Sequence, residues 1–186
     1  MKATFITMIT VILAFTLPLL IIGCSGNDDS PTAPKNQPKA AGTMSALIDD
    51  VSWSAGGNPT GQKSAYAWYT LSNGHLSIYG KKYNAPATTG SSINLSIAAF
   101  GEGAFSLSNS GNYAIYKRDD PYFESDIINT TGTVTITKFD KNNKIVQGTF
   151  ECQVKGIGGV DINGHIYYVY INITNGKFDV EYIGEN

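Results

Sequence analysis

The two histidines of the chain, His75 and His165, are the side chains best suited to bind a transition metal. Each directly follows an Asn-Gly pair, which is typical of a tight turn. A metal site would need both turns at the same end of the fold and a third ligand such as Asp161. The alternative is that both histidines flank turns as ordinary polar residues. We expect the alternative, with no metal and no other cofactor.

A second candidate for metal chemistry is the charged segment 117–126, which holds four carboxylates in an otherwise weakly charged chain. Carboxylate oxygens are the ligands that Ca²⁺ prefers. These carboxylates lack the every-other-residue spacing of an EF-hand loop, and the adjacent Lys117 and Arg118 would compete with the ion. The segment is therefore predicted to be a solvated loop.

Patterns that would indicate catalysis are missing from the sequence. There is no G-x-S-x-G motif, and no Ser, His and Asp can be grouped into a nucleophilic triad. The glycine-rich segment 156–159 lacks the Gly-Lys ending of a phosphate-binding loop, so we expect a flexible connection between strands. The chain is predicted not to be an enzyme. The alternative, a hydrolase acting on an envelope polymer, would require paired carboxylates in a deep pocket.

Cysteine chemistry is indicated at the N-terminus, where Lys2 precedes a long apolar run that ends at Cys24. The last four residues, 21–24, read Ile-Ile-Gly-Cys and resemble the lipobox of bacterial lipoproteins. That resemblance implies cleavage after residue 23 and a diacylglycerol on the Cys24 thiol, which would anchor the protein to a membrane. The alternative is an uncleaved membrane helix, which Pro18 and four threonines disfavour.

Residues 24–43 are predicted to form a flexible tether after the lipidated cysteine. The segment contains Pro31, Pro34 and Pro38 and has no apolar periodicity. Ser25 is not the Asp that retains lipoproteins at the inner membrane in the well-studied sorting system, so the resemblance implies an outer-membrane location. Segment 25–29 is similar to the Ser- and Asp-rich export tags of surface lipoproteins, and the alternative is a plain polar linker. Both a periplasmic and a cell-surface orientation remain open.

Composition then limits the rest of the chain. The formal net charge is −2, with 15% charged and 11% aromatic residues, so there is no basic surface with which to bind nucleic acid. Low charge together with 11 Tyr and 20 Gly favours β structure. If Cys24 carries lipid, Cys152 is the only other thiol and no intramolecular disulfide forms. We expect Cys152 to be buried on the same strand face as Phe150 and Val154.

Short alternating segments separated by Gly, Asn, Asp and Pro predict an all-β domain over residues 44–183. One hairpin is expected across Asp49-Asp50 and another across Asn73-Gly74. The expected strands are 44–48, 51–55, 65–71, 75–81, 93–99, a short one around 113–115, 133–137, 145–154, 166–173 and 177–182. About ten antiparallel strands fit a β-sandwich or a flattened β-barrel, and the sequence leaves both open. The strand around Tyr113 and Ile115 is expected to bury these two residues.

Aromatic residues are the candidates for ligand binding. In segment 65–71, Ala65, Ala67 and Tyr69 share one face, which we assign to the core. Tyr66 and Trp68 then face outward, where their rings could stack on a glycan or contact a protein ligand. The alternative is an ordinary set of cross-strand pairs on a solvent-facing sheet.

Three segments, 132–140, 145–152 and 173–180, together with 51–55 and 111–113, resemble a family of uncharacterised bacterial lipoproteins, a domain of unknown function. The resemblance covers about residues 44–183 and supplies no catalytic residues. It implies a surface or periplasmic lipoprotein. The expected function is that of a non-enzymatic binding or accessory domain, and the alternative is a structural or adhesion protein of the envelope.

Overall fold

The computed structural model describes residues 42–58, 60–70, 72–84, 90–98, 101–108, 111–119 and 122–184, with the backbone alone at 122–124 and 126–129. All of them belong to one compact unit, Asn36–Asn186. The predicted signal peptide, Cys24 and nearly all of the predicted tether lie outside the described residues.

The described residues form ten strands and no helix, which confirms the all-β prediction. The strands are β1 (Thr43–Ile48), β2 (Val51–Ser54), β3 (Ala65–Thr70), β4 (His75–Tyr83), β5 (Gly90–Ala98), β6 (Gly103–Leu107), β7 (Tyr113–Asp119), β8 (Tyr122–Asp140), β9 (Ile145–Val160) and β10 (Ile166–Gly184).

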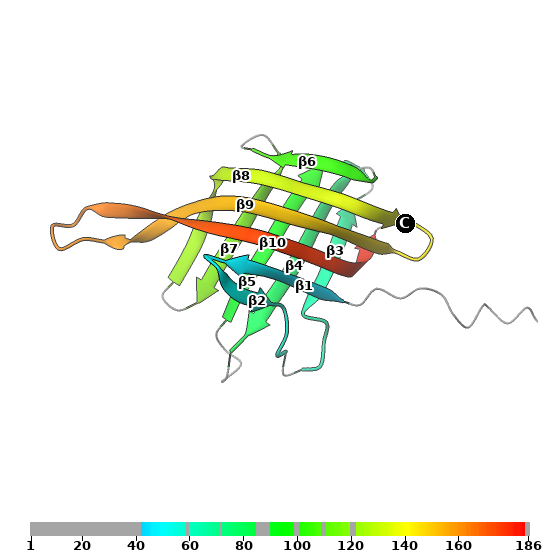
Figure 1. The fold of residues 1–186 in the computed structure, drawn as a ribbon, viewed down its shortest axis with the longest axis horizontal. Helices are drawn as coiled ribbons and strands as arrows, with labels where there is room; N and C mark the ends of the chain where they lie inside the picture. The colour runs from blue at the N-terminus through cyan, green and yellow to red at the C-terminus, as the bar shows by residue number, and fades with distance from the viewer. Residues whose placement is uncertain are drawn as a thin grey trace, which may run out of the picture. The chain divides into compact units, whose positions relative to one another are not determined.

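These strands form a β-sandwich, which decides between the two architectures that the sequence left open. One sheet contains β2, β1, β10, β9, β8 and β6, and the other contains β3, β4, β5 and β7. Strands of the second sheet cross those of the first steeply (Figure 1). The long strands β8 and β10 reach both sheets: β8 pairs with β7, and the end of β10 pairs in parallel with β3.

Both predicted hairpin turns are confirmed. Asp49 and Asp50 have φ angles of 45° and 65°, the left-handed conformation that a two-residue hairpin requires at both central positions. Gly74 has a φ of 62° between β3 and β4. Because a glycine has no Cβ, this conformation costs it no steric strain. These turn residues therefore set the pairing of β1 with β2 and of β3 with β4.

One predicted turn is wrong. Residues 166–173 and 177–182 were expected to be two strands joined across Asn175, but they are one continuous strand, β10. Asn175 does adopt a positive φ of 52°, yet β9 pairs with β10 on both sides of it, with a register shift between Ile173 and Gly176. The local turn conformation therefore produces a β-bulge in a long strand pair. Strand β6 was not predicted, so the expected count of about ten strands is right because two errors cancel.

The predicted face of the strand around residue 113 is also wrong. In β7, Ala114 and Tyr116 are buried, whereas Tyr113 and Ile115 are half-buried on the opposite face. The reason is the pairing with β5, which sets Tyr116 opposite Ile93 and Ala114 opposite Leu95. Paired residues point to the same side of a sheet, so the inward-facing residues of β5 determine the face of β7.

The core lies between the two sheets and contains the residues predicted for the strand after Asp140. Val146, Phe150, Cys152 and Val154 are all buried. The largest fully buried side chains come from both layers: Met44, Leu76, Ile78, Ile93, Leu95, Ile97, Leu107, Ile136, Ile145 and Ile173. Apolar residues at every second position of crossing strands thus make one continuous core.

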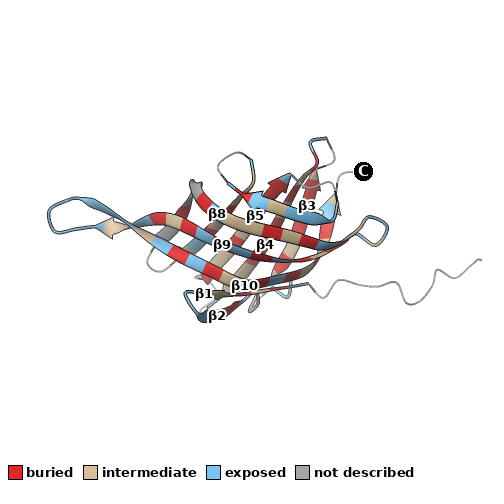
Figure 2. Ribbon diagram, turned by 45° about the horizontal axis from the view of Figure 1, so that its top comes forward, coloured by how far each residue is buried: buried red, intermediate tan, exposed pale blue. Residues whose placement is uncertain are grey.

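Strands β9 and β10 continue beyond the sandwich as a projecting two-stranded hairpin (Figure 1), here called the arm and defined as residues 157–170. Segment 156–159, predicted to be a flexible connection, belongs to strand β9. Its glycines make room for an aromatic ring, because a Cβ at Gly158 would lie 2.5 Å from the ring of Tyr167. Figure 2 shows that exposed residues predominate in the arm, while buried positions recur along both strands within the sandwich.

Candidate functional site

The outer surface of the second sheet carries the two aromatic residues that the sequence singled out. Ala65, Ala67 and Tyr69 are buried in the core, and Trp68 is 49% exposed on the opposite face of β3, as predicted. Tyr66 is half-buried on that same face, where its ring packs against Tyr79 at a centroid distance of 5.3 Å.

Polar side chains and one further apolar residue surround these rings. Trp68 pairs with Ser77 on β4, and Ser77 pairs with Ser96 on β5. On the other side, Trp68 pairs with Ile183 of β10, which is also exposed. Cross-strand pairs stand side by side on one face, so the exposed indole lies between the Ile183 side chain and the half-buried Ser77 hydroxyl, while Ser96 is buried at 1% exposed. We call the accessible set (Tyr66, Trp68, Ser77, Tyr79 and Ile183) the outer aromatic face.

The chemistry available on the outer aromatic face is stacking and hydrogen bonding. Burial raises the pKa of Tyr66 and of Tyr79, so both phenol groups remain protonated at neutral pH and can donate a hydrogen bond. The buried Ser96 hydroxyl is not part of this chemistry, because it is 1% exposed and its Oγ lies 3.2 Å from Nε2 of His75. Rings next to the phenol groups and the Ser77 hydroxyl suit a ligand with an apolar face and hydroxyl substituents.

The histidine arrangement considered from the sequence is contradicted by the strand pairing. Strand β10 begins one residue after His165, and its other end, Gly184, pairs with Tyr69. His75 pairs with Thr70, next to Tyr69, so the two histidines lie near opposite ends of a 19-residue strand. Across the described residues, no three His, Cys, Asp or Glu side chains are grouped so that they could hold a metal ion.

Asp161 instead organises the tip of the arm. Its carboxylate accepts hydrogen bonds from the backbone N–H groups of Asn163 and His165, both at 2.8 Å, and Nδ1 of His165 lies 3.3 Å from Oδ2. The hydrogen bond from the His165 backbone is the main cause that lowers the pKa of Asp161. Asp161 and His165 are therefore turn-forming residues.

The charged segment 117–126 is only partly described. Lys117, Arg118 and Asp119 are the last three residues of strand β7 and are not part of a loop. The other carboxylates of the segment lie outside the side chains that the structure describes.

Cys152 is buried within the sandwich, as predicted, and is 7% exposed. Burial raises the pKa of its thiol to about 12, so it is not ionised at neutral pH. A neutral buried thiol is a poor nucleophile and a poor metal ligand. Cys152 is therefore a structural residue.

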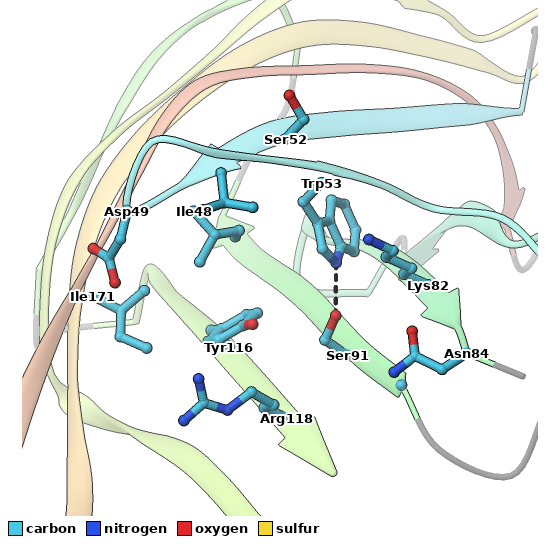
Figure 3. Close-up of a pocket in the computed structure, with 12 residues that line it drawn as sticks. Ile48, Asp49, Ser52, Trp53, Lys82, Asn84, Ser91, Tyr116, Arg118 and Ile171 are labelled. Carbon is cyan, nitrogen blue, oxygen red and sulfur yellow. Dashed lines mark hydrogen bonds between the residues drawn. The ribbon is translucent and has the colours of Figure 1, made fainter. Parts of the chain in front are cut away.

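A pocket that the sequence did not reveal opens at one end of the sandwich, with a volume of about 380 Å³ (Figure 3). Its walls come from the β1–β2 hairpin, the end of β4, the start of β5, β7 and β10. The indole N–H of Trp53 donates a hydrogen bond to Oγ of Ser91, at 2.8 Å. In the sequence, Trp53 lies within the predicted strand 51–55, close to the Asp49-Asp50 turn.

The pocket carries both charge signs. Asp49 is tied into the fold, since its Oδ1 accepts the N–H of Asn172 at 2.8 Å and its own N–H donates to the Asn172 carbonyl oxygen at 2.9 Å. Lys82 and Arg118 add two cations to the lining. Burial raises the pKa of Tyr116, so this phenol is neutral at physiological pH.

None of the described residues belongs to a helix long and apolar enough to span a lipid bilayer. No curated protein and no solved structure matches the chain. A family model, described as a domain of unknown function (DUF6252), matches residues 42–179. The match covers the strands of both sheets, from β1 into the last part of β10. The chain therefore belongs to the DUF6252 family.

Proposed function

We propose that this protein is a lipid-anchored, non-enzymatic binding domain of the bacterial outer membrane that binds a glycan through its outer aromatic face. The observation that carries the proposal is the exposed indole of Trp68, held on a rigid strand beside Tyr66, Tyr79 and the half-buried hydroxyl of Ser77. Sugars present apolar ring faces edged with hydroxyl groups, and this surface offers the complementary chemistry.

The fold supports binding over catalysis in one respect. Among the described residues that line the pocket in Figure 3, Asp49 is the only carboxylate, so this pocket lacks the carboxylate pair of a glycoside hydrolase. The Asp49 carboxylate is also engaged with the backbone of β10. A rigid β-sandwich with an exposed aromatic face is the arrangement that a binding domain needs.

The anchor is proposed from the sequence around Cys24. A lipidated Cys24 followed by the tether of residues 25–43 would hold the β domain away from the membrane, facing either the periplasm or the cell surface. The test is metabolic labelling with a fatty-acid analogue. Wild-type protein is expected to incorporate the label, and Cys24→Ala is expected to remain an unlabelled precursor. Labelling that persists in the variant would refute the lipid anchor.

The glycan site is tested by Trp68→Ala, measured by binding to purified envelope polysaccharides. We expect binding to weaken by roughly 1–3 kcal/mol, because an exposed aromatic ring at the centre of a contact contributes that much. The melting temperature should change little, since the ring is half exposed.

Tyr168→Ala is the matched control, since Tyr168 is an exposed aromatic residue on the arm. It should leave glycan binding unchanged. Equal binding by wild type and Trp68→Ala would remove the outer aromatic face from the proposal. If the wild type binds a protein and no polysaccharide, and Trp68→Ala loses that binding, the outer aromatic face is still the binding site but its ligand is a protein.

A further inference from the structure

We propose that the pocket at the end of the sandwich is a second binding site, separate from the outer aromatic face, for a small carboxylated ligand of the size of one acidic sugar. Its volume of about 380 Å³ lies within the range of small-molecule sites. Nothing in the proposed glycan contact at Trp68 requires this pocket, so the two sites can be tested independently.

The pocket is built on the fixed part of the fold. Trp53 and Tyr116 form apolar walls and are each 5% exposed, and the Trp53–Ser91 hydrogen bond joins the two sheets across the pocket. The β1–β2 hairpin is held on both sides: Asp49 bonds to Asn172 of β10, and the N–H of Gly56 bonds to the Lys81 carbonyl oxygen at 3.0 Å. A site with supported walls requires little ordering when a ligand binds.

The charged residues that line the pocket favour a negatively charged ligand. Lys82 and Arg118 contribute two positive charges, whereas Asp49 is the only negative side chain of the lining. One Asp49 oxygen already accepts a hydrogen bond from the backbone of Asn172. The Lys82 ammonium forms no ion pair or hydrogen bond with any residue that the structure describes. A ligand carboxylate would give it a partner.

Hydrogen-bonding groups around these cations specify a ligand with hydroxyls. Ser91 and Asn84 lie beside Lys82, and Figure 3 shows Lys82 and Asn84 on the side of the pocket nearer Trp53, with the Arg118 guanidinium on the other side, next to Tyr116. The aromatic wall of Trp53 and Tyr116 suits the apolar face of a ring. A six-membered sugar ring with a carboxylate presents all three features.

The experiment compares three probes on the full β domain by NMR titration: glucuronate, glucose and acetate. Glucuronate is expected to bind more tightly than glucose or acetate. Its chemical-shift changes should be confined to residues that line the pocket, including the Trp53 indole. Lys82→Gln should weaken glucuronate binding about tenfold, the size of a lost charged hydrogen bond.

Lys81→Gln is the matched control, because Lys81 lies on the opposite face of β4, where its Nζ sits 4.8 Å from the Tyr83 ring centroid. It should leave glucuronate binding unchanged. An unaltered melting temperature for both variants shows that the fold is intact. Equal binding of glucose and glucuronate would refute the selectivity for carboxylates, and the absence of shifts with all three probes would refute the site. Trp68→Ala should not alter the titration.

Discussion

Strands β9 and β10 pass through two regions that share one backbone pairing and differ in burial. Within the sandwich, Phe150, Val154, Ile173 and Phe178 are buried against the second sheet. In the arm, the same two strands expose a run of large apolar side chains: Ile157, Val160, Ile166, Tyr167, Tyr168 and Tyr170. Residues Ile166–Ile173 pair with residues 152–160 of β9, with one register shift between Tyr167 and Tyr168, so both regions are held by the same antiparallel pairing. Burial depends on whether a second layer covers the strands.

The arm retains its form through local contacts. Lys155 Nζ lies 4.2 Å from the centroid of Tyr168, and the Tyr167 ring covers Gly158 and Gly159. Asp161 closes the tip. An isolated two-stranded ribbon is marginal in water, so the sandwich at its base is needed to hold it. The arm is therefore expected to tolerate changes that the sandwich does not.

The largest expected effect comes from removing one aromatic ring from each region and comparing the losses of stability. Phe150→Ala should lower the free energy of unfolding by about 3–5 kcal/mol, because it leaves a cavity beside Phe178 in a packed core. Tyr168→Ala should cost under about 1 kcal/mol, since it removes an exposed ring and one cation–π contact. Urea denaturation measures both. Similar losses in the two variants would mean that the arm is packed as tightly as the sandwich.

A smaller effect is expected from adding one methyl group to a glycine in each region. At Gly148 a Cβ would lie 2.1 Å from the Thr135 carbonyl oxygen, and the backbone of β8 cannot move away. Gly148→Ala should therefore cost about 1–3 kcal/mol.

At Gly158 the nearest atoms, at 2.5 and 2.6 Å, belong to side chains and not to backbone: the exposed Tyr167 ring can rotate into solvent, whereas Val169 is partly buried against the core. Gly158→Ala should be the milder change, with thermal melts as the measurement. The opposite ranking would show that the arm glycines are the tighter contacts.

The smallest expected effect on stability comes from an experiment that measures the reaction rates of two thiols on strand β9, one in the sandwich and one in the arm. Native Cys152 should react very slowly with a water-soluble disulfide reagent, because a pKa of about 12 leaves almost no thiolate at pH 7–9. A second thiol placed on the arm by Ile157→Cys should react at once.

The pH dependence of stability follows from the same shift. The pKa of Cys152 is raised in the folded protein, so its contribution is complete below the ordinary thiol pKa and is lost as pH rises toward about 12. Cys152→Ala should remove this alkaline loss.

In the thiol-reactivity experiment, rapid labelling of Cys152 in the Ile157→Cys protein without denaturant would show that β9 opens within the sandwich.

Much of the local structure follows from the sequence. Alternating residues define the inner faces of β3 and β9, so the burial of Ala65, Ala67 and Cys152 and the exposure of Trp68 could be predicted. The positive φ angles of Asp49, Asp50 and Gly74 follow from residue type. The two-residue alternation of strands and the turn preferences of individual residues depend only on close neighbours in the chain, so both can be predicted from a single sequence.

Only the tertiary structure decided what depends on a distant partner. Asn175 has turn chemistry, but pairing with β9 on both sides converts the turn into a bulge. Strand β7 turns Ala114 and Tyr116 inward because β5 presents Ile93 and Leu95 there. The pocket joins Trp53, Ser91 and Tyr116 from three strands that are far apart in the chain. Strand pairing and layer contact arise between residues tens of positions apart, and no local pattern in one sequence encodes which partner a strand will meet.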